Sequence, residues 1–276
     1  MPGFLVIMVD MLSFRDLANG FRQLELDPDW PVMVHASLSA FGEVRGGAET
    51  LLGALLAGRR ALLMPAFTYK TMLTPEDGPA DNAIRYGRGR DQNLMAEFFS
   101  PDMPVDPVIG VLAETLRRQP SVQRSSHPVL SFCGIQVEAA LNAQNLGEPL
   151  APIGVLASQA GWVILAGVHH TANTSLHYAE RLAGRPQFVR WALTQDGVRE
   201  IPGFPGCSDG FEKIAVSVQD LLRQVQIGGA LVRAYPLQAL VERAAGLIRQ
   251  DPLALLCEQA ECERCGEIRR RFAAAN

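Results

Sequence analysis

Residues 32–65 read VMVHASLSAFGEVRGGAETLLGALLAGRRALLMP, and this stretch decides the fold class. Residues 32–34 and 61–64 are short apolar runs of the kind that forms buried strands. Between them, the small and glycine-rich segment 37–47 leads into a helix expected at about residues 48–57. A strand, a glycine-rich turn, a helix and a second strand in succession indicate an α/β fold.

The same alternation continues on both sides of this stretch. Ser13 begins a helix whose apolar face extends to Leu24, and residues 163–165 form another buried strand. The periodicity also predicts helices at about residues 108–118, 135–143, 211–224 and 237–248, a helix beginning near Thr174, and one or two strands near 187–193. The expected architecture is a central sheet with flanking helices.

The expected organisation is one domain over residues 13–276, preceded by an extension at residues 1–12. Residues 66–107 have weak periodicity and many prolines and glycines, which is typical of a functional insert or lid. Residues 250–276 form a C-terminal tail that carries three of the five cysteines.

The composition excludes several classes of protein. The net charge of −4 argues against a nucleic-acid binder, which usually carries a basic surface stripe. The longest apolar run, residues 4–9, is too short to span a membrane and lacks the flanks of a signal peptide. We therefore expect a cytoplasmic protein, a monomer or homodimer, that binds neither nucleic acid nor membrane.

The first candidate site is the segment His35-Ala36-Ser37-Leu38-Ser39, followed by Gly46-Gly47. It leaves a strand and enters a helix, where free backbone N–H groups and the helix dipole favour anions. The glycine-lysine pattern of a P-loop is absent. An ordinary tight turn remains the alternative.

A second candidate is Arg124-Ser125-Ser126-His127, whose side chains suit a phosphate or a carboxylate. The alternative is a surface loop that ends in a proline turn.

The third candidate is the junction His169-His170-Thr171-Ala172-Asn173-Thr174-Ser175-Leu176-His177-Tyr178-Ala179-Glu180, which follows a buried strand and opens a helix. His177 and Glu180 are three residues apart, so they share a helix face and the carboxylate can orient the imidazole. Structural histidines with satisfied hydrogen bonds are the alternative.

The fourth candidate is Cys257-x4-Cys262-x2-Cys265, whose spacing suits a zinc ion. Cys207 is the candidate fourth ligand, which would tie the tail to the rest of the protein. The alternative is a set of reduced thiols without a metal, and Cys133 lies in an apolar stretch typical of a core.

Taken in order, these segments resemble the aminoglycoside 3-N-acetyltransferase family, also called the antibiotic N-acetyltransferase family. The resemblance covers about residues 13–271 and includes the closing Cys-x-x-Cys. It rests on the motifs His35-x-Ser37-Leu38-Ser39-x-x-Gly42, Gly46-Gly47-Ala48, Leu63-Met64-Pro65, Arg124-Ser125-x-His127-Pro128, Gly167-Val168 and Ala172-Asn173-Thr174-Ser175-Leu176-His177-x-x-Glu180.

The resemblance implies an α/β enzyme, distinct from the GNAT acetyltransferases, that moves an acetyl group from acetyl-CoA to the 3-amino group of a 2-deoxystreptamine aminoglycoside. His177 would be the general base, with Glu180 and Asp209 as its catalytic carboxylates, and the cleft would be acidic. The coenzyme would contact His35, Ser37, Leu38, Ser39, Gly46, Gly47, Arg124, Ser125 and His127. The amine would contact Tyr69, His170, Asn173 and Glu212.

Two alternatives remain open on the sequence alone. The acceptor could be another small biosynthetic or peptidyl amine, selected by the insert at residues 66–107. The protein could also be a zinc-containing CoA binder that has lost catalysis. Ala36 and Thr171 depart from the family motifs, because relatives often carry serine and some carry aspartate at these positions.

Overall fold

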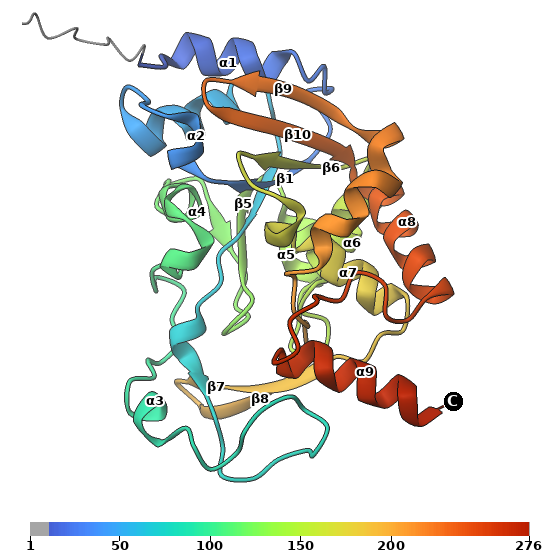
Figure 1. Ribbon diagram of the computed structural model, residues 1–276. Helices are drawn as coiled ribbons and strands as arrows, with labels where there is room; N and C mark the ends of the chain where they lie inside the picture. Colours follow the sequence, from blue (N-terminus) through green and yellow to red (C-terminus); the bar gives the residue numbers. More distant parts are fainter. Residues whose placement is uncertain (1–10, 276) are drawn as a thin grey trace, which may run out of the picture.

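A mixed central sheet organises the protein, for which a computed structural model describes residues 11–275 (Figure 1). Within these residues it has seven strands in the order β4-β5-β2-β1-β6-β10-β9. The strands are β1 (Val32–Ala36), β2 (Leu62–Pro65), β4 (Gln123–Arg124), β5 (Phe132–Ile135), β6 (Trp162–Ala166), β9 (Arg223–Ile227) and β10 (Ala230–Pro236). The expected α/β architecture with a central sheet is confirmed.

The centre of the sheet is parallel and fully covered. β1 pairs in parallel with β2 on one side and with β6 on the other, whereas β5 and β10 add to these three strands in antiparallel orientation. All five residues of β6 are buried. Strands covered on both faces are continuously apolar, which is why residues 32–34, 61–64 and 163–165 are recognisable in the sequence.

Helices cover both faces of the sheet. Met33 and Val163 belong to one apolar core with α5–α8, while the neighbouring Val34 and Ile164 belong to a second core with α1, α2 and α4. This division follows from the two-residue period of a strand. The helices are α1 (Phe14–Arg22), α2 (Gly47–Leu56), α4 (Val111–Arg117), α5 (Glu138–Ala143), α6 (Ala151–Ser158), α7 (Ser175–Leu182) and α8 (Leu237–Gln250). No helix of the described residues combines the length and apolar character needed to cross a membrane.

A second, smaller sheet lies beyond the main one, near α9 (Glu263–Ala275) and α3 (Arg90–Leu94) at the lower end of Figure 1. Its strands are β3 (Met72–Leu73), β7 (Phe188–Thr194) and β8 (Gly197–Phe204). The segment expected as an insert packs onto it, since the Asn82 side chain accepts a hydrogen bond from Val189 N at 2.7 Å and donates to Val189 O at 2.9 Å.

Several predicted elements differ in the structure. The helix expected at residues 211–224 is a 3₁₀ segment over Phe211–Leu221, and Arg223 already begins β9. The helix expected from residue 135 begins at Glu138, because Ile135 still pairs with β2. The sequence did not reveal α6, β8, the β9–β10 hairpin or α9. The α6 sequence APIGVLAS contains proline and glycine, which usually interrupt helices.

The predicted boundary of the N-terminal extension is also corrected. Residues 1–10 of that extension lie outside the described residues. Leu12 belongs to the folded body, because its amide donates to Glu43 O at 2.8 Å and its carbonyl accepts from Arg45 N at 2.9 Å.

Ile164→Ala is expected to lower the free energy of unfolding by about 2–5 kcal/mol, because Ile164 is fully buried in the central strand and truncation leaves a cavity. Urea denaturation followed by circular dichroism measures this loss. Val216→Ala, at a side chain that is 85% exposed, is the control and should change stability by less than about 0.5 kcal/mol. Equal effects of the two substitutions would contradict the assignment of this strand to the core.

Candidate active site

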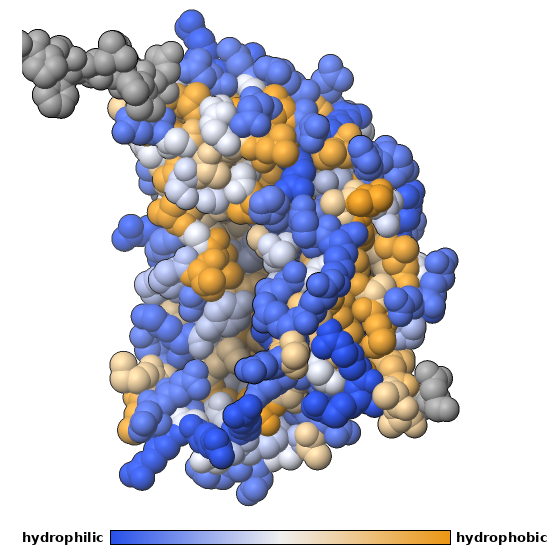
Figure 2. Space-filling model, viewed as in Figure 1, coloured by the Kyte–Doolittle hydropathy of each residue, from blue (hydrophilic) through white to orange (hydrophobic). Residues whose placement is uncertain are grey.

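A cavity of about 810 Å³ opens where the three parallel strands end. His35 lies near the end of β1, Phe67 and Tyr69 follow β2, and Val168 follows β6; all four line the cavity. Carboxyl ends of parallel strands meet at one edge of a sheet, which is the usual place for a site in an α/β fold. Figure 2 shows the molecular surface hollowed in this region.

One end of the cavity is formed by the turn between β1 and α2. Ser37, Leu38, Ser39 and Gly47 line it, and the Ser37 and Ser39 hydroxyl oxygens are 3.1 Å apart. Gly46 caps α2 with a φ of +80°, a left-handed conformation that favours glycine, and no side chain caps the helix. The N-terminus of α2 therefore presents uncapped backbone amides near two hydroxyl groups, which suits an anion.

His177 lies on the opposite side of the cavity and is held by a buried carboxylate. Its Nδ1 is 2.7 Å from Glu180 Oε2, and the other oxygen of Glu180 accepts from Arg185 Nη1 at 2.6 Å. Glu180 and Arg185 are both at least 95% buried. With Nδ1–H donating to the carboxylate, the lone pair of Nε2 is available to a molecule in the cavity.

The guanidinium of Arg185 also connects this pair to the chain after α8. Its Nη2 donates to Pro252 O at 2.8 Å and to Ala254 O at 2.6 Å. The Phe211 ring packs against the His177 imidazole, with 4.7 Å between ring centroids. These contacts fix the position of the imidazole from three separate segments.

The four cysteines predicted as zinc ligands lie together, next to the pair of Glu180 and Arg185. The sulfur atoms of Cys207, Cys257, Cys262 and Cys265 all lie within 4.8 Å of one another. Cys207 also lines the cavity, so the cluster and the cavity share one segment of chain. Three of the four thiols are buried, whereas Cys262 is partly exposed.

The charge of the cavity is balanced. Among the described residues that line it, Asp209 is the one carboxylate and Arg264 is the one guanidinium. The expectation of an acidic cleft is therefore corrected. Neighbouring carboxylates are engaged elsewhere, as with Glu180 on Arg185 and Glu212 on Arg233.

Comparison with known proteins agrees with this geometry. A family model described as aminoglycoside 3-N-acetyltransferase matches residues 33–249, which is most of the chain. The chain belongs to the aminoglycoside 3-N-acetyltransferase family.

Individual family members cover the chain to different extents. Aminoglycoside N(3)-acetyltransferase VII of Streptomyces paromomycinus is 34% identical over 62% of this chain and 60% of its own length. Aminoglycoside N(3)-acetyltransferase IV of a Salmonella species is 28% identical over 87% and 89% of the two chains.

The fold is similar to that of a solved member of the family. The crystal structure of the aminoglycoside acetyltransferase AAC(3)-IVa apoenzyme superposes with a TM-score of 0.78 at 27% identity, covering 95% of this chain and 98% of that one. A histidine-to-alanine mutant of the same enzyme, in complex with a gentamicin, superposes with a TM-score of 0.76 at 26% identity, covering 96% and 99%.

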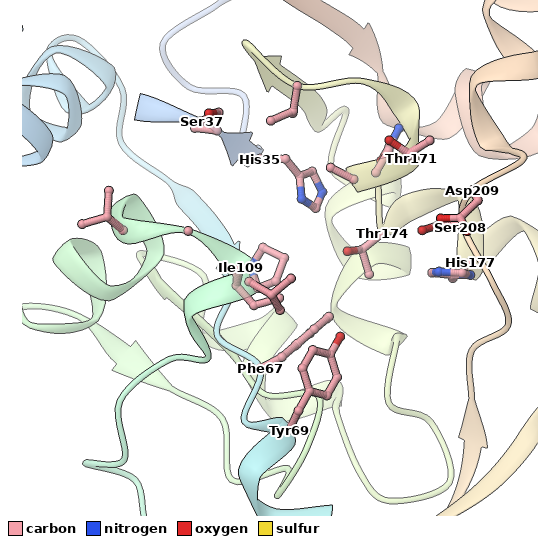
Figure 3. Close-up of a pocket in the computed structure, with 18 of the residues that line it drawn as sticks. His35, Ser37, Phe67, Tyr69, Ile109, Thr171, Thr174, His177, Ser208 and Asp209 are labelled. Atoms are coloured by element: carbon pink, nitrogen blue, oxygen red, sulfur yellow. The ribbon is translucent and has the colours of Figure 1, made fainter. Parts of the chain in front are cut away.

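Two carboxylates that the family resemblance assigned to the site are placed differently by the structure. Asp209 lines the cavity beside His177 (Figure 3), but its Oδ2 accepts from Gln259 Nε2 at 3.2 Å, and the carboxylate bonded to His177 is that of Glu180. Glu212 does not line the cavity. It accepts from His170 N at 2.7 Å and from Arg233 Nη1 at 3.0 Å, so it holds the junction together.

His170 is likewise corrected from a substrate contact to a core residue. It is fully buried against Tyr235 and its Nδ1 lies 3.3 Å from Asn173 Nδ2. Burial lowers the pKa of His170 to about 4. Asn173 does line the cavity, and its Oδ1 accepts from both the amide and the hydroxyl of Ser175, which begins α7.

The basic loop predicted to bind coenzyme lies outside the cavity. The Arg124 guanidinium donates to three backbone carbonyls, those of Ala66, Pro101 and Met103. Ser125 Oγ accepts from Phe132 N at 2.9 Å. Arg124 thus holds the insert, and the Ser125 hydroxyl bonds to the backbone of β5; these protein contacts occupy both side chains.

His127 makes the same kind of local contact. Its Nδ1 accepts from Val129 N at 3.2 Å and Leu130 N at 2.9 Å, and burial lowers the pKa of His127 to about 4. It lines a second cavity, which shares no lining residue with the cavity that contains His177.

Several residues that line the cavity were absent from the candidate sites in the sequence, namely Phe67, Ile109, Ser208 and Arg264. Phe67 lies at the start of the predicted insert, where the change from a strand to irregular chain was the available signal, and Ile109 lies just after its end. Arg264 was hidden within the Cys262-x2-Cys265 motif. Of the residues assigned to the coenzyme, Gly46 shapes the turn without lining the cavity.

His127→Asn is expected to make stability less sensitive to acid. The unfolded chain binds a proton near pH 6.5 and the folded His127 only near pH 4, so this histidine's contribution is complete above pH 6.5 and is lost as pH falls toward 4. Asparagine keeps an acceptor for the two amides but does not titrate. Between pH 7 and pH 4.5, urea denaturation should show the wild type losing about 2–3 kcal/mol more than the variant. Equal losses of stability in the wild type and the variant would contradict the assignment of His127 as a histidine whose pKa is lowered by burial.

Proposed function

We propose that the protein is an acetyl-CoA-dependent N-acetyltransferase that modifies the 3-amino group of 2-deoxystreptamine aminoglycosides. The single observation that carries the proposal is the imidazole of His177, held by Glu180 with its second nitrogen available to the cavity. The family, and a relative whose structure contains a gentamicin, support the substrate class. We further propose a cytoplasmic site of action, where acetyl-CoA is available.

Acetyl-CoA would occupy the end of the cavity formed by Ser37, Leu38, Ser39 and Gly47. Coenzyme A carries three phosphate groups, and the uncapped N-terminus of α2 with two serine hydroxyls offers donors for anionic oxygens. The thioester would then extend toward the middle of the cavity, where His35 projects between Ser37 and His177 (Figure 3).

His177 would act as general base through Nε2. It takes a proton from the acceptor ammonium or attacking amine, the nitrogen forms a bond to the thioester carbonyl carbon, and the C–S bond breaks. The products are an N-acetyl amide and coenzyme A, whose thiolate recovers a proton. An amine is nucleophilic only when neutral, and a histidine is suited to this transfer near neutral pH.

Glu180 and Arg185 would be positioning residues. The carboxylate selects the tautomer in which Nδ1 carries the proton and stabilises the imidazolium that forms. The guanidinium holds the carboxylate from its far side. His35 would not compete as a base, because burial lowers its pKa to about 3.

We also propose a structural zinc ion bound by Cys207, Cys257, Cys262 and Cys265. Four thiols within 4.8 Å of one another match the ligand set and compactness of a closed tetrahedral zinc site. When bound, the metal would link the C-terminal tail to the segment that carries Cys207 and lines the cavity. It would take no part in the transfer.

Purified protein mixed with acetyl-CoA and gentamicin should release free thiol, measured with a thiol-reactive dye, and the product should gain one acetyl group at the 3-amine by mass spectrometry and NMR. His177→Ala should lower kcat by about 10²–10⁴-fold, because the general base is lost. His169→Ala is the control. It removes an imidazole that is 72% exposed at the same junction but outside the cavity lining, and activity should be retained. Near-wild-type turnover by His177→Ala would contradict the mechanism.

Protein purified without chelators should contain about one zinc per chain by elemental analysis. Cys265→Ser should lower both the zinc content and the melting temperature, because structural metal binding contributes directly to folding. Cys133→Ser changes a buried cysteine outside the cluster and should leave the zinc content unchanged. Full stability with no metal in the wild type would refute the site.

A further inference from the structure

Arg264 lines the cavity from an unusual position. It lies between Cys262 and Cys265 at the start of α9, and its Nη1 donates to Gly206 O at 2.9 Å. The cysteine cluster on one side and the bond to Gly206 on the other hold its stem. The guanidinium is partly buried and its direction is set by the fold.

The charge of Arg264 has no ion-pair partner within residues 11–275. The adjacent Glu263 is paired with Arg85, at 2.6 Å between Oε1 and Nε. Glu180 lies behind the cavity wall and is paired with Arg185. Asp209 lines the same cavity, and the amide of Gln259 contacts its carboxylate.

The remaining charged neighbours of Arg264 increase the positive character of this end. The pKa of Arg190 is lowered to about 10, mainly by burial and secondly by the nearby positive charge of Arg264. Arg264 also lines a small space that it shares with Cys207 and Cys265 of the cysteine cluster and with the ion pair of Glu180 and Arg185. A guanidinium has five N–H donors, and within residues 11–275 the bond to Gly206 O is the one hydrogen bond that Arg264 makes, so an anionic group of a bound molecule would find donors here.

Tyr69 adds a neutral donor at the same end. Its hydroxyl points into the cavity (Figure 3), and burial raises the pKa of Tyr69 to about 12, an effect that the nearby Arg264 opposes. A phenol that stays protonated and a guanidinium together provide the donors that a carboxylate accepts.

The phosphate groups of the coenzyme are not the anions that would bind Arg264 and Tyr69. The Ser37 turn, where the coenzyme phosphates are proposed to bind, lies across the cavity from Tyr69 and Asp209 in Figure 3. Arg264 is bonded to Gly206, which is close in the chain to Asp209 and lines the same cavity, so Arg264 and Tyr69 belong to the end that receives the acceptor. At that end the cavity is lined by the guanidinium of Arg264 and the carboxylate of Asp209, and these two opposite charges complement an acceptor that is a zwitterion.

We propose that Arg264 and Tyr69 can bind a carboxylate on the acceptor, so that the site acetylates, in addition to aminoglycosides, primary amines that carry an acid group, such as amino acids and short peptides. This proposal rests on the acetyltransferase chemistry proposed above. The amine is deprotonated at His177, the N–C bond forms as the C–S bond breaks, and the products are an N-acetyl acid and coenzyme A. The acceptor carboxylate remains bound to Arg264 throughout.

A dipeptide and its C-terminal amide test the proposal, because they share the amine and differ in the acid. With acetyl-CoA as donor and thiol release as readout, kcat/KM should be at least tenfold higher for the free acid. Arg264→Gln should abolish this preference, Arg264→Lys should retain part of it, and the KM for acetyl-CoA should stay unchanged. Arg270→Gln, on the same helix but exposed and paired with Glu267, should keep the preference.

Equilibrium binding of the N-acetyl dipeptide and its amide by calorimetry gives the same comparison without turnover. Equal affinities for acid and amide overturn the proposal. It is also overturned if Arg264→Gln raises the KM for acetyl-CoA with every acceptor, or loses zinc while keeping the preference. If gentamicin is acetylated and the dipeptide neither reacts nor binds, this inference fails alone. Absence of thiol release with every amine, together with preferential binding of the acid, refutes the enzymatic function and supports the carboxylate site.

Discussion

The buried carboxylate of Glu180 is the constraint on which the arrangement of the site depends. It has almost no contact with solvent, so protein groups must take the place of water: Arg185 Nη1 supplies the opposite charge at 2.6 Å, and His177 Nδ1 supplies a hydrogen bond at 2.7 Å. Removing one partner of such a buried pair typically costs about 3–5 kcal/mol. The helix α7, the loop after it and the imidazole in the cavity are therefore one electrostatic unit.

This unit extends to the C-terminal part of the chain through Arg185. While Nη1 of the guanidinium donates to Glu180, Nη2 donates to the carbonyls of Pro252 and Ala254. The segment that contains them leads directly to Cys257. The geometry around His177 is thus coupled to how the cysteine-bearing tail folds back on the protein.

The cavity itself follows from the topology of the sheet. β1, β2 and β6 are parallel neighbours, so the segments after them diverge from one edge and leave space between them. Each contributes a different chemistry: the β1 segment provides hydroxyls and a helix N-terminus, the β2 segment provides Tyr69, and the β6 segment provides His177. The tail closes the fourth side with Arg264. One end of the cavity consequently has donors that suit an anion, and the other combines the imidazole of His177 with the opposite charges of Asp209 and Arg264.

The sequence by itself determined the elements whose signal is local. The apolar runs at β1, β2 and β6 are recognisable because strands covered on both faces have no polar positions, and His177 and Glu180 are paired because three residues make nearly one helical turn. The motifs also sufficed to recognise the family. The tertiary structure alone decided which side chains meet across long separations. Arg124 and His127 have the chemistry of ligand-binding residues, yet backbone groups of the insert and β5 occupy them. Arg264 has no local signal, and it reaches the cavity only because the tail packs beside Gly206, 58 residues away. Hydrogen-bond partners and charge compensation are set by the folded chain as a whole, which is why spacing predicted the His177–Glu180 pair but could not predict that Arg264 lines the cavity or that Arg124 and His127 do not.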